Sequence, residues 1–281
     1  MPPKRLDRRE FLRSTRLVIV AGKGGVGKTT VTAVLARAAA EAGLRVLAVD
    51  LDGKPQLGTL VGDVPHLSLS AAAALAEYLE THGLKRVAKR LSSSGIIDVV
   101  STAAPGLDDI VVLGKVKALE RSDEHDLIVV DGPAAGHAIT FLMSARGLLD
   151  TVRGGPIRTQ ALDVLEMLGD PDRCQVVLVT LPETTPVNEL VETAYALEER
   201  VGVQLGPVVV NGVDDGPLLE WTDDTDGGLV AAAQYRNARR QLHRDEIARL
   251  TDVLAIDQIH LPHLVSPGLT DADIRTLVKA L

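Results

Sequence analysis

The sequence predicts an α/β fold, in which a mainly parallel β-sheet is flanked by helices and carries a small helical insertion. Short apolar runs, mostly of β-branched residues, recur along the 281-residue chain with helical patterns between them. These runs are apolar throughout and do not alternate, which is typical of strands buried on both faces of a parallel sheet. We expect strands at residues 17–20, 46–49, 96–100, 127–130, 176–181 and 208–211, and a short last strand within IHLPHL at 259–264.

The first strand leads into GKGGVGKTT (residues 22–30) and then into a helical pattern. One face of the predicted helix carries apolar residues at the i, i+3, i+4, i+7 spacing, namely Val31, Val34, Leu35 and Ala38. Gly43 supplies a C-terminal stop before the second strand. A strand, a glycine loop, a helix and a strand in this order form a unit that binds phosphates at the carboxyl edge of a sheet.

Later stretches are less regular. Residues 53–94 include an alanine- and leucine-rich patch that predicts one or two helices, and residues 137–173 predict further helix with a break at GGP (154–156). Residues 228–254 have the pattern of a long polar helix, preceded by an acidic run, 223–228, that we expect to be a solvated loop. Trp221, the only tryptophan, is expected to be a half-buried anchor. We predict one domain at residues 16–281 after a basic, partly disordered leader at residues 1–15.

Composition excludes several classes of function. Lys and Arg number 30 against 38 Asp and Glu, a net charge of -8, so we expect no nucleic-acid partner. The only cysteine is Cys174, which we expect to be a small buried residue, and without a cysteine pair we expect no zinc site. No apolar run reaches membrane-spanning length, so we expect no transmembrane segment. Residues 7–14 resemble a twin-arginine export motif but lack the apolar segment that must follow it, and we expect a cytoplasmic protein.

The loop at residues 22–30 predicts a phosphate site. Gly22, Gly27, Lys28 and Thr29 fit G-x-x-x-x-G-K-[ST], and they lie between a predicted strand and a predicted helix, the context that makes the motif specific. Lys28 would contact the β- and γ-phosphates, and the Thr29 hydroxyl would be a ligand of Mg²⁺. We therefore expect ATP and Mg²⁺ as ligands. The expected nucleotide-binding residues of the loop are Gly22, Lys23, Gly24, Gly25, Val26, Gly27, Lys28, Thr29 and Thr30.

Three carboxylates follow predicted strands and complete the expected metal site. Asp131 closes LIVVD and is expected to hold the metal through water. Asp50 and Asp52 close VLAVDLD and would share a face if the extended conformation continues. We assign Asp52 to orienting or activating the attacking water and Asp50 to supporting the Mg²⁺ shell; the alternative is that either is only a surface acid or a helix cap.

Lys23 is a second cation in the loop, five positions before Lys28. Phosphoryl transfer places charge on the γ-phosphate oxygens, and a cation placed there lowers the barrier. Because Lys28 already makes the loop's own phosphate contact, Lys23 could reach a second nucleotide. This hypothesis implies an isologous dimer or a heterodimer with a related chain. A solvated Lys23, or one that contacts its own nucleotide, remains the alternative.

The early lysine of KGGVGKT resembles the deviant Walker A loop of the MinD, ParA and ArsA group of P-loop ATPases. Within that group, DGPAAGHAITFL (131–142) resembles the switch segment D-x-A-P-T-G-H-T-L-R-L-L of ArsA-type ATPases. Asp131, Gly136 and His137 fall on the pattern, and Pro133 lies one position before its proline. DGKPQL (52–57) lies where that family has D-P-A-H-S-L, with Asp52 and Leu57 retained. The layout is most similar to short actinobacterial ArsA-like proteins.

This resemblance implies a P-loop NTPase fold, ATP hydrolysis and further site residues. Asn211 would read the adenine, and the backbone near Pro262 and His263 would form the other wall of the base pocket. Asp52, Pro133, Gly136 and His137 would belong to switches that sense the γ-phosphate, although a structural hydrogen bond is an equal alternative for His137. With one cysteine and three methionines in the chain, we expect neither an arsenite-thiolate site nor a methionine-rich groove for a transmembrane client.

Three functions follow as hypotheses. The first is a cytosolic, dimeric Mg²⁺-ATPase whose nucleotide state changes its contact with an unknown client or partner protein. The second is a MinD- or ParA-like positioning ATPase that binds membrane or DNA in its ATP state. The third is a slow regulatory subunit of a heterodimeric ATPase.

The C-terminal segment bears on the second hypothesis. LTDADIRTLVKAL places Leu269, Ile274, Leu277, Val278 and Leu281 on one helical face, which could bind a membrane. Its balanced charges lack attraction for anionic lipid, and packing on the sheet is the alternative that we favour.

Overall fold

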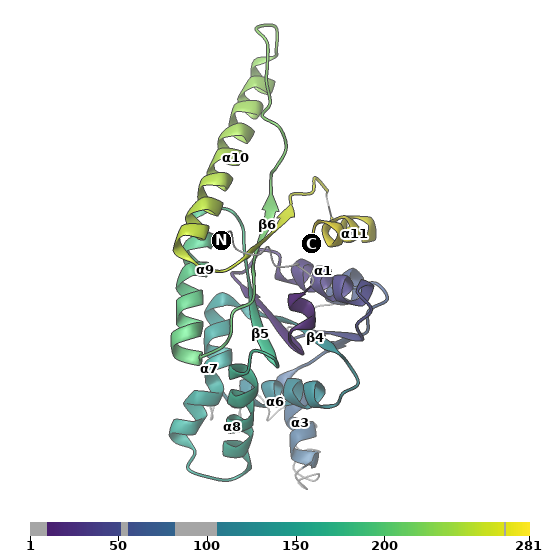
Figure 1. Ribbon diagram of the computed structural model, residues 1–281, viewed down its shortest axis with the longest axis vertical. Coiled ribbons are helices and arrows are strands. Elements are labelled where there is room, and N and C mark those ends of the chain that lie inside the picture. The colour runs from purple at the N-terminus through teal and green to yellow at the C-terminus, as the bar shows by residue number, and fades with distance from the viewer. Residues whose placement is uncertain (1–9, 52–55, 82–105, 267) are drawn as a thin grey trace.

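The computed structural model describes residues 10–51, 56–81, 106–266 and 268–281, and its centre is a seven-stranded β-sheet (Figure 1). The order of the strands is β3-β2-β4-β1-β5-β6-β7, and every neighbouring pair is parallel. The predicted α/β class and parallel sheet are confirmed. The strands are β1 (Leu17–Gly22), β2 (Val46–Asp50), β3 (His66–Ser68), β4 (Leu127–Ala134), β5 (Cys174–Thr180), β6 (Val208–Val213) and β7 (Gln258–Pro262).

The predicted strands agree with this sheet within the described residues. β1, β2, β4, β5, β6 and β7 each contain or overlap a predicted run, whereas the strand predicted at 96–100 lies outside the described residues. β3 was not predicted. It is three residues long, lies at the edge of the sheet beside β2 and is largely exposed, so it carries no apolar run to signal it.

Alternate strand residues face two separate hydrophobic cores. In β1, Leu17 and Ile19 belong to one core and Val18 and Val20 to the other. The first core is completed by α6 (Leu107–Arg121), α7 (Ala135–Thr151), α8 (Pro156–Gly169) and α9 (Thr184–Ala196). The second is completed by α1 (Lys28–Glu41), α11 (Asp271–Ala280) and the 3₁₀-helix η1 (Phe11–Arg13). Burial on both faces explains why the strands are apolar without alternation.

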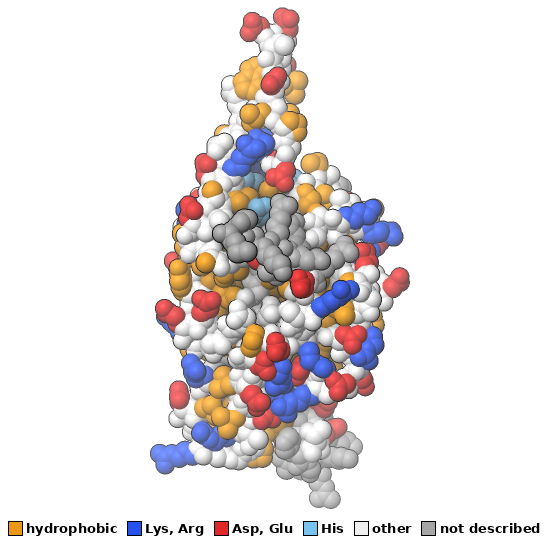
Figure 2. Space-filling model, viewed as in Figure 1, with side chains coloured by type: hydrophobic (Ala, Val, Ile, Leu, Met, Phe, Trp, Pro, Cys, Tyr) orange, Lys and Arg blue, Asp and Glu red, His pale blue; other side chains and the backbone are white. Residues whose placement is uncertain are grey.

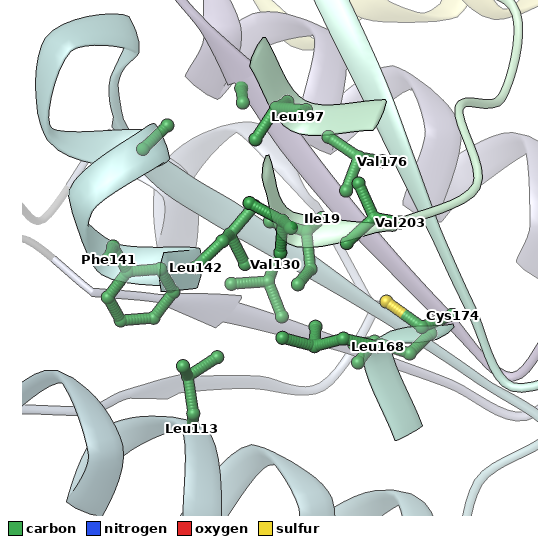
Figure 3. Packing of buried hydrophobic residues seen from close by; sticks show 14 of the residues in the cluster. Ile19, Leu113, Val130, Phe141, Leu142, Leu168, Cys174, Val176, Leu197 and Val203 are labelled. Atoms are coloured by element: carbon green, nitrogen blue, oxygen red, sulfur yellow. The ribbon is translucent and has the colours of Figure 1, made fainter. Parts of the chain in front are cut away.

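Figure 3 shows the first core from nearby. Ile19, Val130 and Val176 come from adjacent strands and meet Leu113 of α6 and Leu142 of α7. Cys174 lies in the same cluster and is fully buried, as predicted. Burial raises the pKa of its thiol to about 12, so this cysteine acts as a small apolar side chain.

The expected leader at residues 1–15 requires a correction at its inner end. Residues 1–9 lie outside the described residues, but Phe11 and Leu12 of η1 are buried against the second core. The Arg13 guanidinium donates a 2.9 Å hydrogen bond to the Ala42 carbonyl at the end of α1. Residues 10–15 therefore belong to the folded body, because two large apolar side chains in the basic stretch gain burial there.

The C-terminal helix packs on the body. α11 has an apolar face, as predicted. Ile274, Leu277 and Val278 on this face are buried in the second core, where α11 contacts α1 and β7. Thr270 and Asp273 form a capping box at its start. Three of the five residues proposed as a membrane contact are thus already covered, whereas Leu269 is 38% exposed. Among the described helices, none combines the length and apolar character needed to cross a bilayer.

The remaining helices are α2 (Gln56–Leu60), α3 (Ala71–Thr81), the single π-helical turn η2 (Leu197–Val201) and α10 (Gly227–Val253). The predicted GGP break separates α7 from α8, and Pro156 occupies the first turn of α8. α10 is the long helix predicted at 228–254. Figure 1 shows that its first turns, with the chain that leads into them, extend well beyond the sheet.

Candidate nucleotide-binding site

The predicted site residues lie at one edge of the sheet, where the parallel strands end. β1 leads into the loop at 22–30, β2 ends at Asp50, and Asp131 is the register partner of Asp50 on the neighbouring β4. On the other side of β1 and β5, β6 carries Asn211 and β7 ends at Pro262. The carboxyl edge of an open α/β sheet is where such folds bind ligands.

Two glycines of the loop are required by its geometry. A side chain at Gly22 would place Cβ only 2.4 Å from the Val179 carbonyl oxygen on β5. Gly27 has φ +91°, the left-handed region, and a Cβ there would lie 2.3 Å from the Asn211 amide nitrogen. The loop can pass this close to β5 and β6 only because both positions lack a side chain.

The N-terminus of α1 is open to an anion. α1 begins at Lys28, its first turn holds no acidic residue, and its N-cap, Gly27, has no side chain to cap it. The first N–H groups of a helix lack acceptors within the helix and carry positive partial charge. The Lys28 ammonium donates a 3.3 Å hydrogen bond to the Lys23 carbonyl, which holds it over the loop. Backbone donors and a lysine together are suited to phosphate.

A hydroxyl and two carboxylates lie beside this loop. The Thr29 hydroxyl donates a 2.6 Å hydrogen bond to Oδ2 of Asp131, and Asp50 lies opposite Asp131 in the register of β2 and β4. Asp50 is buried and accepts a 3.0 Å hydrogen bond from the Ser68 hydroxyl. Hydroxyl and carboxylate oxygens are the ligands that Mg²⁺ prefers. The residues predicted for the metal therefore fit it, and they come together from α1, β4 and β2.

Asp52 lies outside the described residues. β2 ends at Asp50, and Leu51 lies in a bend. The predicted role of Asp52 toward water stays a prediction.

Lys23 has a partner that the sequence did not reveal. Its ammonium lies 2.5 Å from Oε1 of Glu189, on the second turn of α9. The two side chains are 41% and 38% exposed, so water screens the pair. The Lys28 ammonium contacts the backbone carbonyl of Lys23, whereas the Lys23 ammonium contacts α9. The ammonium groups of the two lysines therefore lie at different places.

The residues predicted for the base pocket lie together at the ends of β6 and β7. The Asn211 amide donates a 2.9 Å hydrogen bond to the Val26 carbonyl of the loop. Pro262 is the register partner of Val213, and the His263 N–H donates a 2.9 Å hydrogen bond to the Val213 carbonyl. The structure thus shows Asn211 supporting the loop. Its role toward adenine stays a prediction.

The second predicted switch joins β4 to α7. Pro133 is in β4, Gly136 is in the first turn of α7, and the exposed His137 follows it. A cavity of about 400 Å³ beside it is lined by Asp109, Pro133, His137 and Phe141 among others. Burial raises the pKa of Asp109, and the neighbouring Asp108 raises it further. A change in the position of this segment would alter the cavity.

Another cavity, of about 580 Å³, lies at the opposite edge between the end of α1 and the start of β2. Its lining includes Glu41, Leu44 and Val46, and none of the predicted site residues. Cavity size alone therefore does not locate the candidate phosphate site.

Sequence reasoning missed three residues of the site. Ser68 and Glu189 contact Asp50 and Lys23 across 18 and 166 positions. A Cβ at Gly132 would lie 2.5 Å from the Val20 carbonyl oxygen on β1, where the β1–β4 register shifts. Only Gly132 carried a local signal, as a glycine directly after the aspartate that closes the apolar run of β4.

Comparison with known proteins decides the family. Residues 17–260 match the family model described as the CobQ/CobB/MinD/ParA nucleotide binding domain, and this range holds every part of the site except Pro262 and His263. The chain belongs to this nucleotide-binding family. The resemblance to MinD, ParA and ArsA proteins, drawn from the loop and switch motifs, is thereby confirmed.

Curated relatives place this member of the family near proteins named as ATPases. The chain is 30% identical to ATPase BagA of Mycobacterium tuberculosis, in an alignment that covers 96% of this chain and 93% of BagA. It is 31% identical to an arsenical pump-driving ATPase of Acidiphilium multivorum and 30% identical to one of Escherichia coli. Those alignments cover 85% and 69% of this chain, but only 41% and 34% of the pump ATPases. Of these three relatives, BagA is the one whose alignment covers nearly the whole of both chains.

Proposed function

We propose that the chain is a Mg²⁺-dependent ATP hydrolase that works as a nucleotide-switched dimer and couples turnover to a partner protein. Family membership supports nucleotide binding, and the ATPase names of the relatives support hydrolysis. The observation that carries the proposal is the pair of lysines in one loop, with Lys28 over the phosphate cradle and Lys23 directed to α9.

The chain's own groups account for substrate binding. The N–H groups at the start of α1 and the Lys28 ammonium would bind the β- and γ-phosphates of ATP. Thr29, Asp131 and Asp50 would hold Mg²⁺, directly or through water. When bound, Mg²⁺ neutralises charge on the phosphate oxygens. Asn211, with the backbone at Pro262 and His263, would hold the adenine at the ends of β6 and β7.

Hydrolysis needs an attacking water and a cation for the charge that develops. We assign the orientation of water to Asp52, two positions after the end of β2 in the sequence. We assign the cation to Lys23 of the opposing subunit. In the single chain Lys23 is engaged by Glu189, so its transfer to a partner's nucleotide requires that ion pair to open. An exposed pair contributes only about 0–1 kcal/mol, so a triphosphate can compete for the lysine.

The switch segments give the route to a partner. Asp52 and the segment at Pro133, Gly136 and His137 would sense the γ-phosphate, and its loss would let them move. Such a motion would change the surface and the cavity beside α7 that a partner protein contacts.

Two variants test the proposal. Lys23→Ala should bind ATP as the unchanged chain does and lose turnover, whereas Lys28→Ala should lose nucleotide affinity. Turnover per chain should rise steeply with protein concentration for a homodimer. Full turnover of Lys23→Ala, or of a strictly monomeric chain at saturating ATP and Mg²⁺, would refute the role of Lys23 across subunits. A flat, near-zero rate at every concentration would instead indicate that a heterodimer partner is missing.

A further inference from the structure

The narrow projection at residues 214–235 is built from two antiparallel segments. The chain leaves β6 at Val213, runs outward through residues 214–226 and returns along the first turns of α10. Every residue from 217 to 224 is exposed, and before Ala233 no residue of α10 is buried. Figure 1 shows this part of the chain standing away from the sheet. We call residues 214–235 the tip.

Side-chain contacts anchor the outgoing segment to α10. Asp214 and Arg236 form a two-pronged ion pair with both distances 2.9 Å, and Arg236 also donates to the Pro217 carbonyl. Asn237 bonds both the N–H and the carbonyl of Leu219. Asp226 caps the first turn of α10. The tip is therefore held in one arrangement before any partner arrives, which lowers the entropy lost on binding.

Large apolar side chains gather on this tip. Leu218, Leu219, Trp221, Leu229 and Tyr235 are 57%, 40%, 42%, 64% and 70% exposed, and together they are five of the eleven large hydrophobic residues exposed in the described chain. Figure 2 shows apolar side chains along the projection. Single exposed apolar residues are ordinary, but five on one rigid projection mark an interaction surface. Tryptophan and tyrosine are the residues most often found at the energetic centre of interfaces. From the sequence we expected Trp221 to anchor the fold. Its exposed position on the tip is better suited to anchoring a partner.

The charge of the tip selects among partners. Residues 214–235 contain no Lys or Arg, and their acidic residues are Asp214, Asp215, Glu220, Asp223, Asp224 and Asp226. Asp214 is paired with Arg236, which leaves five acids around the apolar residues. Anionic lipid and nucleic acid are repelled by such a surface. Two copies that met tip to tip would bring like charges together.

From the rigidity, the apolar residues and the charge we infer that the tip is a docking site for a partner protein. The segment that it binds is basic and amphipathic, a helix with Leu-like side chains on one face and Lys or Arg beside them. Its apolar face would cover Trp221, Leu218 and Leu229, and its cations would meet Asp223 and Asp224. This inference goes beyond the proposed ATPase function, because the tip lies outside the nucleotide site.

Trp221 supplies the measurement, since it is the only tryptophan in the chain. The probe is a synthetic amphipathic peptide of leucine and lysine, titrated into the nucleotide-free full chain. A saturable blue shift of the tryptophan emission is expected, because the indole leaves water. The same peptide with glutamate in place of lysine should give no shift.

Matched variants separate this tip from other exposed surface. Replacing Leu218 and Leu229 by Ser should weaken peptide binding by about tenfold or more, the loss typical of two central interface residues. Leu162 on α8 is 49% exposed, and Leu162→Ser should change the affinity for the peptide less than about twofold. The double variant Asp223→Asn/Asp224→Asn should bind the peptide more weakly at low salt, and its affinity should depend less on salt concentration. Asp252→Asn, at the far end of α10, should have neither effect.

Four results of the binding titrations would overturn the inference. They are an unchanged emission with the lysine peptide, an equal affinity for the glutamate peptide, an equal loss from Leu162→Ser, and a blue shift with vesicles of anionic lipid. Self-association that the Leu218 and Leu229 variant abolishes would assign the tip to a second copy and also refute it. Because nucleotide is absent from these measurements, a failure of the Lys23 prediction leaves their outcome unaffected.

Discussion

The Lys23 ammonium and the Glu189 carboxylate, 166 positions apart, meet at 2.5 Å between the phosphate loop and α9. This contact occupies the lysine that we assign to the opposing subunit's nucleotide. Under the proposed function it would act as a weak latch on the single chain, which the approach of a second triphosphate would open.

Removing the latch should raise turnover when dimers are scarce. Glu189→Gln leaves Lys23 without its ion pair. Because exposed ion pairs contribute at most about 1 kcal/mol, the rate of ATP turnover should rise no more than about fivefold. The measurement is ATP turnover at a protein concentration below half-maximal dimerisation. Glu192→Gln, also on α9 and exposed, serves as the matched control and should leave the rate unchanged. A lower rate for Glu189→Gln would show that the glutamate holds Lys23 in its working position.

A methyl group at Gly27 should abolish the phosphate cradle. Gly27→Ala places a Cβ against the Asn211 amide in a left-handed conformation that costs a non-glycine residue about 1–2 kcal/mol. We expect nucleotide affinity to fall more than about tenfold when a fluorescent ATP analogue is titrated. Gly24→Ala is the control, because its Cβ meets nothing within 4 Å, and it should bind within about threefold of the unchanged chain. Equal losses in both would mean that the loop rejects any side chain.

The carboxylate at Asp131 should carry the magnesium dependence of binding. In Asp131→Asn the partner of the Thr29 hydroxyl loses its charge, so the gain in nucleotide affinity that Mg²⁺ provides should shrink by about 10–100-fold. Affinity measured in a chelator should stay within about twofold. Asp172→Asn, in an exposed turn before β5, is the control for charge alone. If the gain from Mg²⁺ persists in Asp131→Asn, the metal is not held by Asp131.

Acid should destabilise the base of α10 through His243. This histidine is 3% exposed, and burial together with the nearby Arg239 lowers the pKa of its ring in the folded chain. The unfolded chain therefore binds the proton first as pH falls below the ordinary value of about 6.5, and the free energy of unfolding decreases over that range. Urea unfolding at pH 7.5 and 5.5 measures the difference.

His243→Gln cannot titrate, so its stability should change less between these two pH values. His66→Gln, on the exposed strand β3, should keep the slope of the unchanged chain. An identical slope in His243→Gln would assign the acid sensitivity to other groups.

Much of the fold, and the position of several candidate site residues within it, could be predicted because their signals are local. β1, the loop and α1 lie within residues 17–41, and the glycines, Lys28 and the apolar spacing are all readable inside that window. Asp50 and Asp131 could be brought to one edge by a general rule, since parallel strands end on the same side of a sheet. β3 was not predicted because its three residues are largely exposed and carry no apolar pattern.

What the sequence alone determined is the parallel sheet, the glycine loop between β1 and α1, and the acidic residues Asp50 and Asp131 at its edge, since each follows from residues near one another in the chain. The tertiary structure decided which strand lies beside which, that Glu189 meets Lys23, that α11 is covered by α1, and that the apolar residues of the tip are left in water. The physical reason is that side-chain pairing and burial depend on which distant segments pack together, and local spacing in the chain does not encode that choice.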